Sequence, residues 1–104
     1  MFDPLLHQPT RTQIMSVIAS NEDGASFAQL LEATKTSNGN LSTHLRALED
    51  NGYISVNKFF EGRRPKSVYV LTEQGMNAFL DYIDALDKFV DVCPIKKRNH
   101  GKTI

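Results

Sequence analysis

The chain has 104 residues and equal numbers of acidic and basic side chains, so its formal net charge at pH 7 is zero. This length suits one compact domain, and the absence of an apolar run of about 20 residues excludes a membrane-spanning helix. The single cysteine, Cys93, excludes an internal disulfide and a multi-thiolate metal site. We therefore expect one cytoplasmic domain over residues 1–92 and a basic, disordered tail over residues 93–104, without a metal or cofactor.

The charges are unevenly distributed along the chain. Residues 35–66 contain six basic and three acidic side chains, whereas residues 1–34 and 67–92 are both net acidic. Attraction to phosphate depends on the charge of the local surface rather than on the total charge. A basic segment between acidic ones is therefore an arrangement that a DNA-binding domain could use.

Two short helices are predicted in the first third of the chain. Pro9 suits a first helical position, and apolar residues then recur at helical spacing until the break at residues 21–24. Ser26 and Gln29 have the spacing of a capping box, which predicts the start of the second helix. The apolar face of this helix continues to Thr34.

A third predicted helix has one apolar and one polar side. Ser37 can act as its N-cap, and Asn51-Gly52 provides a left-handed stop. Leucines at positions 41, 45 and 48 form a narrow stripe to be buried. The other side is either an ordinary solvated face or a surface that meets nucleic acid, and we favour the second interpretation. The candidate DNA contacts here are Ser37, Asn38, Gly39, Asn40, Ser42, Thr43 and Arg46.

A β-hairpin is predicted after the third helix. Ile54 and Val56 alternate with polar residues, residues 61–65 have the composition of a turn, and a second strand rich in Val and Tyr follows from Lys66 to Leu71. A hairpin with a basic tip directly after two helices joined by a short connection is a winged helix-turn-helix. The basic tip could merely aid solubility, but its position favours DNA contact by Lys58, Arg63, Arg64 and Lys66.

A long helix completes the predicted fold, which is mainly α with a small β-hairpin wing (α+β). Thr72 can cap this helix, which should run to about Val92. Its apolar stripe is wider than one small domain needs, and further apolar residues precede the first helix. This surplus predicts a homodimer interface formed by Phe2, Leu5, Leu6, Phe79, Tyr82, Ile83, Leu86, Phe89 and Val90.

Three motifs resemble those of small winged-helix transcriptional regulators of the MarR/ArsR type. They are Gly-Asn-Leu-Ser-x-His-Leu-x-x-Leu-Glu-x-x-Gly-Tyr-Ile at residues 39–54, Phe-Glu-Gly-Arg-Arg-Pro at residues 60–65, and Tyr-x-Leu-Thr-x-x-Gly at residues 69–75. The resemblance implies dimers that form through the first and last helices. The chain lacks the long helical extensions of full-length MarR proteins and the cysteine cluster of metal-sensing ArsR proteins, so a small-molecule effector stays unassigned.

The predicted function is a homodimeric transcriptional regulator that binds double-stranded DNA sequence-specifically. Its recognition helix, residues 37–51, would enter the major groove, and its wing, residues 61–66, would lie on the backbone or in the minor groove. A winged-helix protein–protein interaction module is the alternative. An enzyme is not expected, because Ser42 and His44 are two positions apart on a helix and point to different sides. His44 is expected to pack at the edge of the leucine stripe.

Overall fold

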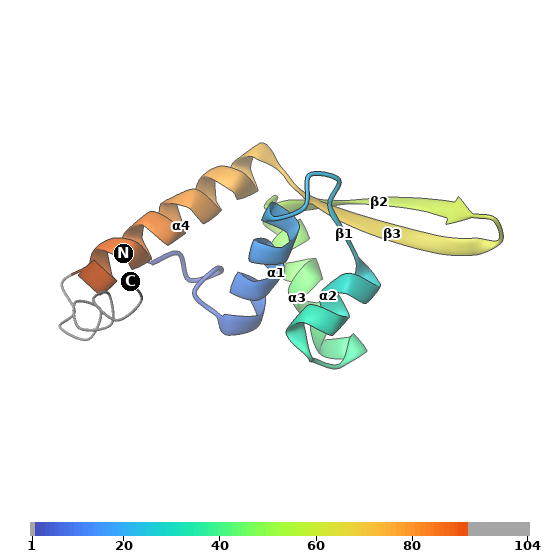
Figure 1. Cartoon of the computed structure of the whole chain (residues 1–104), viewed down its shortest axis with the longest axis horizontal. Helices are drawn as coiled ribbons and strands as arrows, with labels where there is room; N and C mark the ends of the chain where they lie inside the picture. Colours follow the sequence, from blue (N-terminus) through green and yellow to red (C-terminus); the bar gives the residue numbers. More distant parts are fainter. Residues whose placement is uncertain (1, 92–104) are drawn as a thin grey trace, which may run out of the picture.

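The computed structural model describes residues 2–91, with side chains up to Val90 (Figure 1). Most of its helices lie in a central body, from which a long β-hairpin projects at one end and the last helix at the other. This architecture confirms the predicted fold class. The predicted tail, residues 93–104, lies outside the described residues. In chain order the elements are α1 (Pro9–Ala19), β1 (Ala25–Ser26), α2 (Phe27–Thr34), α3 (Asn38–Asp50), β2 (Ile54–Glu61), β3 (Arg64–Leu71) and α4 (Glu73–Asp91).

The helix starts follow the capping residues that the sequence indicates. Pro9 is the first residue of α1, and Ser26 and Gln29 form the predicted capping box at α2, with backbone-to-side-chain bonds of 2.8 and 3.1 Å. The hydroxyl oxygen of Ser37 accepts a bond of 3.1 Å from the Asn40 N–H at the start of α3. The Thr72 hydroxyl similarly accepts from the Gly75 N–H at the start of α4. These predictions are confirmed.

The sheet has the strand order β1-β3-β2, and both pairs of strands are antiparallel. The sequence did not indicate β1, because two residues are too few to show an alternating pattern. The turn of the hairpin is also shorter than predicted. It consists of Gly62 and Arg63, so Arg64 and Pro65 belong to β3 rather than to the turn. Gly62 has a φ of 66°, and a glycine at this first turn position matches the strand twist.

The hydrophobic core lies where α1, α2 and α3 meet the inner end of the sheet. The three leucines of α3 are buried, as predicted, and pack with Ile14 and Ile54 among other residues. Gly75 allows α4 to start close to this core, because a Cβ atom at this position would collide with the backbone carbonyl of Tyr53. The N–H of Thr72 also donates to this carbonyl oxygen, at 3.1 Å.

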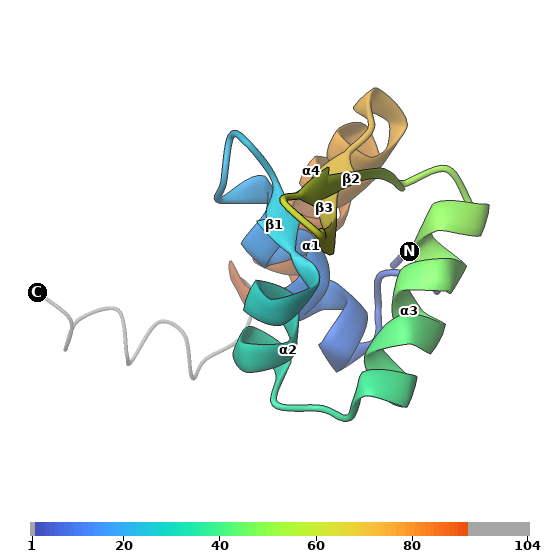
Figure 2. The ribbon, with the colours of Figure 1, turned by 90° about the vertical axis from the view of Figure 1, so that its right-hand side faces the viewer.

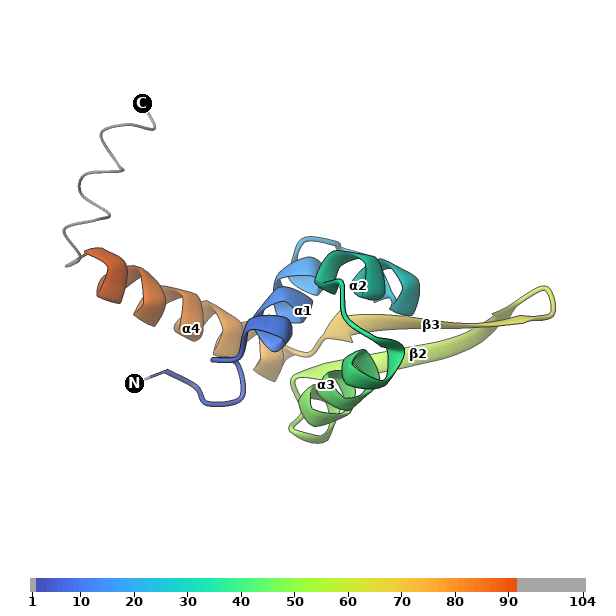
Figure 3. The same ribbon diagram turned by 90° about the horizontal axis from the view of Figure 1, so that it is seen from below.

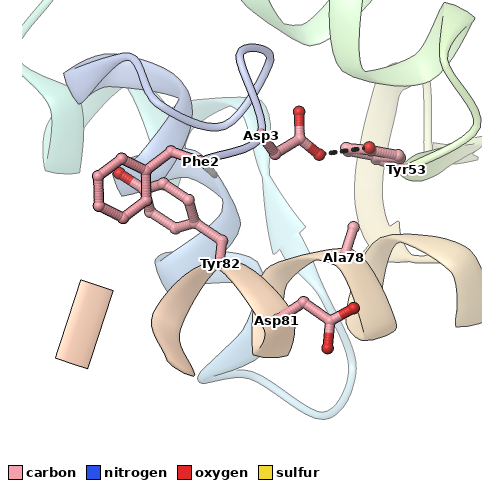
Figure 4. A pocket seen from close by; sticks show the side chains of 6 residues that line it. All are labelled: Phe2, Asp3, Tyr53, Ala78, Asp81 and Tyr82. Atoms are coloured by element: carbon pink, nitrogen blue, oxygen red, sulfur yellow. Dashed lines mark hydrogen bonds between the residues drawn. The ribbon is translucent and has the colours of Figure 1, made fainter. Parts of the chain in front are cut away.

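The segment before α1 folds back onto α4 and closes the core from that side. Leu6 is fully buried, and the Tyr82 side chain on α4 is 6% exposed. Nδ1 of His7 lies 2.9 Å from the Tyr82 hydroxyl, and the Tyr53 hydroxyl donates to Asp3 at 2.6 Å (Figure 4). The hydrogen bond to Asp3 is the main reason why the pKa of Tyr53 is raised to about 12. The side chains of Phe2, Asp3, Tyr53, Ala78, Asp81 and Tyr82 line a cavity of about 440 Å³ at this junction.

These contacts correct one part of the dimer prediction. Leu6, Phe79 and Tyr82 belong to the core of this chain and are not surplus apolar surface. The apolar residues that α4 leaves exposed are instead Met76, Leu80, Ile83 and Phe89. Two of these, Ile83 and Phe89, were predicted interface residues. Among the other predicted ones, Phe2, Leu5, Leu86 and Val90 are half-buried.

Candidate nucleic-acid interface

The first turns of α3 are open to solvent. Ser37, Asn38, Gly39 and Asn40 are all exposed, and a Cβ atom at Gly39 would have no neighbour within 4 Å. Seen from below in Figure 3, α3 lies alongside the inner half of the hairpin, next to β2. The N-terminal end of a helix presents free N–H groups and a partial positive charge, both of which suit an anion such as phosphate.

Thr43 and Arg46 continue the exposed side of α3 toward its C-terminus. The Thr43 hydroxyl donates to the carbonyl oxygen of Gly39 at 2.9 Å, so its hydrogen is used within the helix. This leaves the oxygen of Thr43 as an acceptor and its methyl group for apolar contact. Arg46 lies one turn further along and can donate two parallel hydrogen bonds to a phosphate or a guanine.

A small groove separates α3 from the hairpin and brings predicted contacts from both elements together. Its volume is about 180 Å³. Three predicted DNA contacts line it, Ser42 and Arg46 from α3 and Lys58 from β2. The complete lining is Ser42, Leu45, Arg46, Glu49, Val56, Lys58 and Tyr69.

Four groove residues were not predicted as parts of the site, and two of them, Glu49 and Tyr69, carry polar groups. Burial, and then the nearby Glu49 carboxylate, raise the pKa of the Tyr69 hydroxyl, which therefore stays a neutral hydrogen-bond donor at ordinary pH. The packing of α3 against β2, which the sequence does not show, brings Glu49 into the groove.

The pleat of the hairpin divides its side chains between two faces. Neighbouring residues of a strand point to opposite faces, whereas directly paired residues of two strands share a face. The face toward α3 carries Ile54, Val56, Lys58, Phe60, Pro65, Ser67, Tyr69 and Leu71. The other face carries Ser55, Asn57, Phe59, Glu61, Arg64, Lys66, Val68 and Val70. Of the predicted wing contacts, only Lys58 therefore lies on the face toward α3, while Arg63 occupies the turn.

The basic side chains of the site are free to meet an anion. Within the described part of the chain, ion pairs link Lys35 to Glu32 and Lys88 to Asp84, and none involves a basic residue of α3 or the hairpin. These basic residues are Arg46, Lys58, Arg63, Arg64 and Lys66, all exposed. In Figure 2 the hairpin points toward the viewer near the centre of the molecule, and α3 lies to its right.

His44 lies on α3 beside the leucine stripe and is half-buried, as the sequence predicted. Its Nδ1 atom lies 3.1 Å from Nη1 of Arg11, whose Nε donates to the carbonyl oxygen of Leu5. Burial, and then the positive charge of Arg11, lower the pKa of His44 from its ordinary value of 6.5. His44 is therefore a neutral hydrogen-bond acceptor that holds α3 against α1 and does not face the groove.

No group of three or more His, Cys, Asp or Glu residues within residues 2–90 has the arrangement of a metal site. Nor does any helix in this part of the chain have the length and apolar character needed to cross a membrane.

Comparison with known proteins gives matches over most of the chain. Residues 10–90 match the family described as "Winged helix DNA-binding domain". An uncharacterized protein of Methanocaldococcus jannaschii is 29% identical over 79 residues, which are 76% of this chain and 85% of that protein. Among solved structures, a transcriptional regulator homologue from Pyrococcus horikoshii superposes with a TM-score of 0.76 at 30% identity and covers 84% of this chain and 85% of its own.

More distant solved structures share the fold. MarR superposes with a TM-score of 0.73 at 19% identity, covering 95% of this chain and 74% of its own. The transcriptional repressor CouR, in complex with a 23-mer DNA duplex, has a TM-score of 0.74 at 16% identity and covers 96% of this chain and 72% of its own. The likeness extends over the helices and the hairpin together.

Proposed function

The chain belongs to the winged helix DNA-binding domain family and has the fold of MarR-type transcriptional regulators, and from this we propose that it regulates transcription as a homodimer on double-stranded DNA. The observation that carries the proposal is the shared groove of α3 and the hairpin. There Ser42, Arg46 and Lys58 converge, and the basic residues have no ion-pair partner among residues 2–90. A DNA partner also implies action in the cytoplasm.

In this proposal α3 enters the major groove by its first turns. The exposed side chains of Ser37, Asn40 and Thr43 would meet base edges or phosphates, and the open space at Gly39 would allow close approach to the DNA backbone. Arg46 would contact a phosphate or a guanine. The absence of acidic residues before Glu49 on α3 supports this orientation, because the first turns carry no charge that repels phosphate.

The wing supplies the remaining predicted contacts. In this proposal Arg63 at the turn and Lys58 on the face toward α3 would reach the DNA backbone or the minor groove beside α3. Arg64 and Lys66 lie on the other face and would add positive charge near the same phosphates. The DNA-bound structure of CouR, which has the same fold, supports a DNA duplex as the partner class.

The test is capture of fragmented genomic DNA by the purified protein, followed by sequencing of the retained fragments. We expect a limited set of fragments that share a motif. Binding of one such fragment should fall steeply with salt, with a log-log slope of roughly −5 to −9 if each subunit neutralises about three to five phosphates. Arg46→Ala should reduce the magnitude of this slope. No retention of DNA at low salt would contradict the proposal and favour the protein–protein interaction module.

A further inference from the structure

The hairpin exposes two large apolar side chains. In the described part of the chain, the large apolar residues that are exposed lie either on α4 or at the outer end of β2, where Phe59 is 46% and Phe60 is 73% exposed. Exposed aromatic side chains at the edge of a β-ribbon favour unwanted association, so proteins usually avoid them. Phe60 is therefore the residue of the hairpin whose presence most needs a functional reason.

Phe60 lies on the same face of the hairpin as the groove beside α3. It is two residues beyond Lys58 and four beyond Val56, both of which line this groove. At about 3.3 Å per residue, its Cα atom lies roughly 13 Å further along the strand than that of Val56. The projection of the hairpin from the body is visible in Figure 1. Phe60 thus has no covering surface among residues 2–90, and its side chain is 73% exposed.

The charges around Phe60 favour a polyanion as its partner. Lys58 precedes it on the same face, and Arg63 lies at the turn three residues later. Glu61, the acidic residue of the hairpin, points to the other face, where it lies opposite Arg64 in the strand register. An exposed aromatic ring between two free cations fits a DNA groove, because the cations hold the phosphates while the ring contacts sugars and bases.

We propose that Phe60 is an apolar wedge of the wing, which inserts its ring into the minor groove beside the site of α3 and reads the deformability of the base step there. This inference rests on the proposed function. Apolar side chains that enter the minor groove partly unstack a base step, and flexible pyrimidine–purine steps open at lower cost than stiff ones. Phe60 therefore adds a sequence preference without a hydrogen bond to any base.

The experiment uses the full chain and a DNA fragment captured by the wild type, with the step under the wing located by hydroxyl-radical footprinting. Phe60→Ala should bind about tenfold more weakly with an unchanged salt slope, since the ring carries no charge. Phe60→Leu, which keeps apolar bulk, should retain most of the affinity. The matched control is Phe59→Ala, which removes the neighbouring ring on the opposite face and should bind like the wild type.

A change of DNA sequence tests the wedge itself. Replacing a pyrimidine–purine step under the wing by a stiff A-tract should weaken binding of the wild type, whereas Phe60→Ala should bind both fragments equally. Equal discrimination by the two proteins would overturn the inference. So would an equal loss of affinity in the Phe59 and Phe60 variants. Unfolding temperatures of all variants should match the wild type, because both rings are exposed.

The outcomes separate this inference from the proposed function. Suppose that the wild type binds DNA with a steep salt dependence and that Phe60→Ala binds it with the same affinity. This result would refute the wedge role of Phe60 and leave the proposed DNA-binding function in place. A wild type that retains no DNA at low salt removes both. If Phe60→Ala changes the sedimentation of the free protein but not its DNA affinity, the ring contacts another copy of the chain and the wedge is wrong.

Discussion

Gly39 and Gly75 have different surroundings, although both stand in the first turn of a helix. Gly39 faces open space at the proposed DNA surface, and Gly75 touches the backbone of Tyr53. A methyl group at Gly39 therefore meets nothing in the free protein, whereas a methyl group at Gly75 displaces the start of α4. A substitution at Gly39 is therefore expected to affect DNA binding, whereas a substitution at Gly75 is expected to affect folding.

The prediction for Gly39→Ala is a change of opposite sign in stability and in affinity. The free energy of unfolding should rise by up to about 1 kcal/mol, because alanine is the better helix former. DNA affinity should fall about tenfold, because the methyl group keeps α3 from close approach. Urea unfolding and fluorescence anisotropy measure the two effects.

Gly75→Ala provides the contrast, with a loss of about 2 kcal/mol of stability through overpacking. Unchanged affinity in Gly39→Ala would contradict the placement of this turn against DNA.

His44 gives the fold a dependence on pH. Its pKa is lowered from 6.5 in the folded state by burial and by Arg11, so the unfolded chain takes up a proton more readily. The contribution of His44 is therefore fully present above pH 6.5. It is lost progressively as pH falls through 6.5 and then through the lowered pKa of the folded state. His44→Gln should lack this loss, because glutamine does not titrate and its carbonyl can still accept from Arg11.

Urea unfolding of the wild type and His44→Gln at pH 7.5 and pH 5.5 measures this effect. Other groups titrate in both proteins, so the quantity of interest is the difference between the two proteins in the stability that each loses. The wild type should lose more. Equal losses would mean that the contact between α1 and α3 does not depend on the protonation of His44.

At the scale of the elements, the pleat of the hairpin predicts which of its basic residues contribute most to DNA binding. Lys58 and Lys66 are both exposed lysines, but only Lys58 lines the groove with Arg46. Lys58→Ala should reduce the magnitude of the salt slope by about 1 for each phosphate that the lysine neutralises. Lys66→Ala, on the opposite face, should change it by less than half as much. A larger effect at Lys66 would show that the other face of the hairpin turns toward DNA.

The helices were predictable because their ends carry local chemical signals. Pro9, Ser26, Ser37 and Thr72 satisfy or remove free N–H groups at the helix starts, and these effects depend only on neighbouring residues. β1 escaped prediction because its two residues are recognised only by their pairing with β3. The turn was placed too broadly because arginine and proline also occur in turns.

The parts of the site that the sequence missed depend on contacts between distant segments. Glu49 and Tyr69 are 20 residues apart, and only the packing of α3 on the hairpin brings them to one groove. Leu6 and Tyr82 were likewise misjudged as free surface, since nothing local shows that the N-terminal segment folds onto α4. The amphipathic pattern of α4 revealed the excess of apolar surface but not which residues form it.

At the scale of the whole molecule, the exposed apolar residues of α4 are the best candidates for the dimer interface. Met76, Leu80 and Ile83 are spaced at i, i+4 and i+7, so they lie on one side of the helix. The core of the chain does not cover this side, and Leu80 is 57% exposed. A two-fold dimer would bury the same stripe from both chains, with residue and symmetry mate close together.

Leu80→Glu should therefore dissociate the proposed dimer, because it places two like charges in an apolar interface. Asn77→Glu is the matched control, since it adds the same charge to an exposed position of α4 outside the stripe. Sedimentation at micromolar concentration should give dimers for the wild type and Asn77→Glu, and monomers for Leu80→Glu. A monomeric wild type would remove the dimer from the proposal.

The same variants connect the dimer to DNA recognition. Two copies of α3 on one face of a duplex should engage half-sites about one helical turn apart, roughly 34 Å. Leu80→Glu should then lose the advantage of a fragment with two half-sites over one with a single half-site, while Asn77→Glu keeps it. If Leu80→Glu is monomeric and yet binds the two-half-site fragment as tightly as the wild type, each chain reads DNA alone, and the exposed stripe of α4 serves another contact.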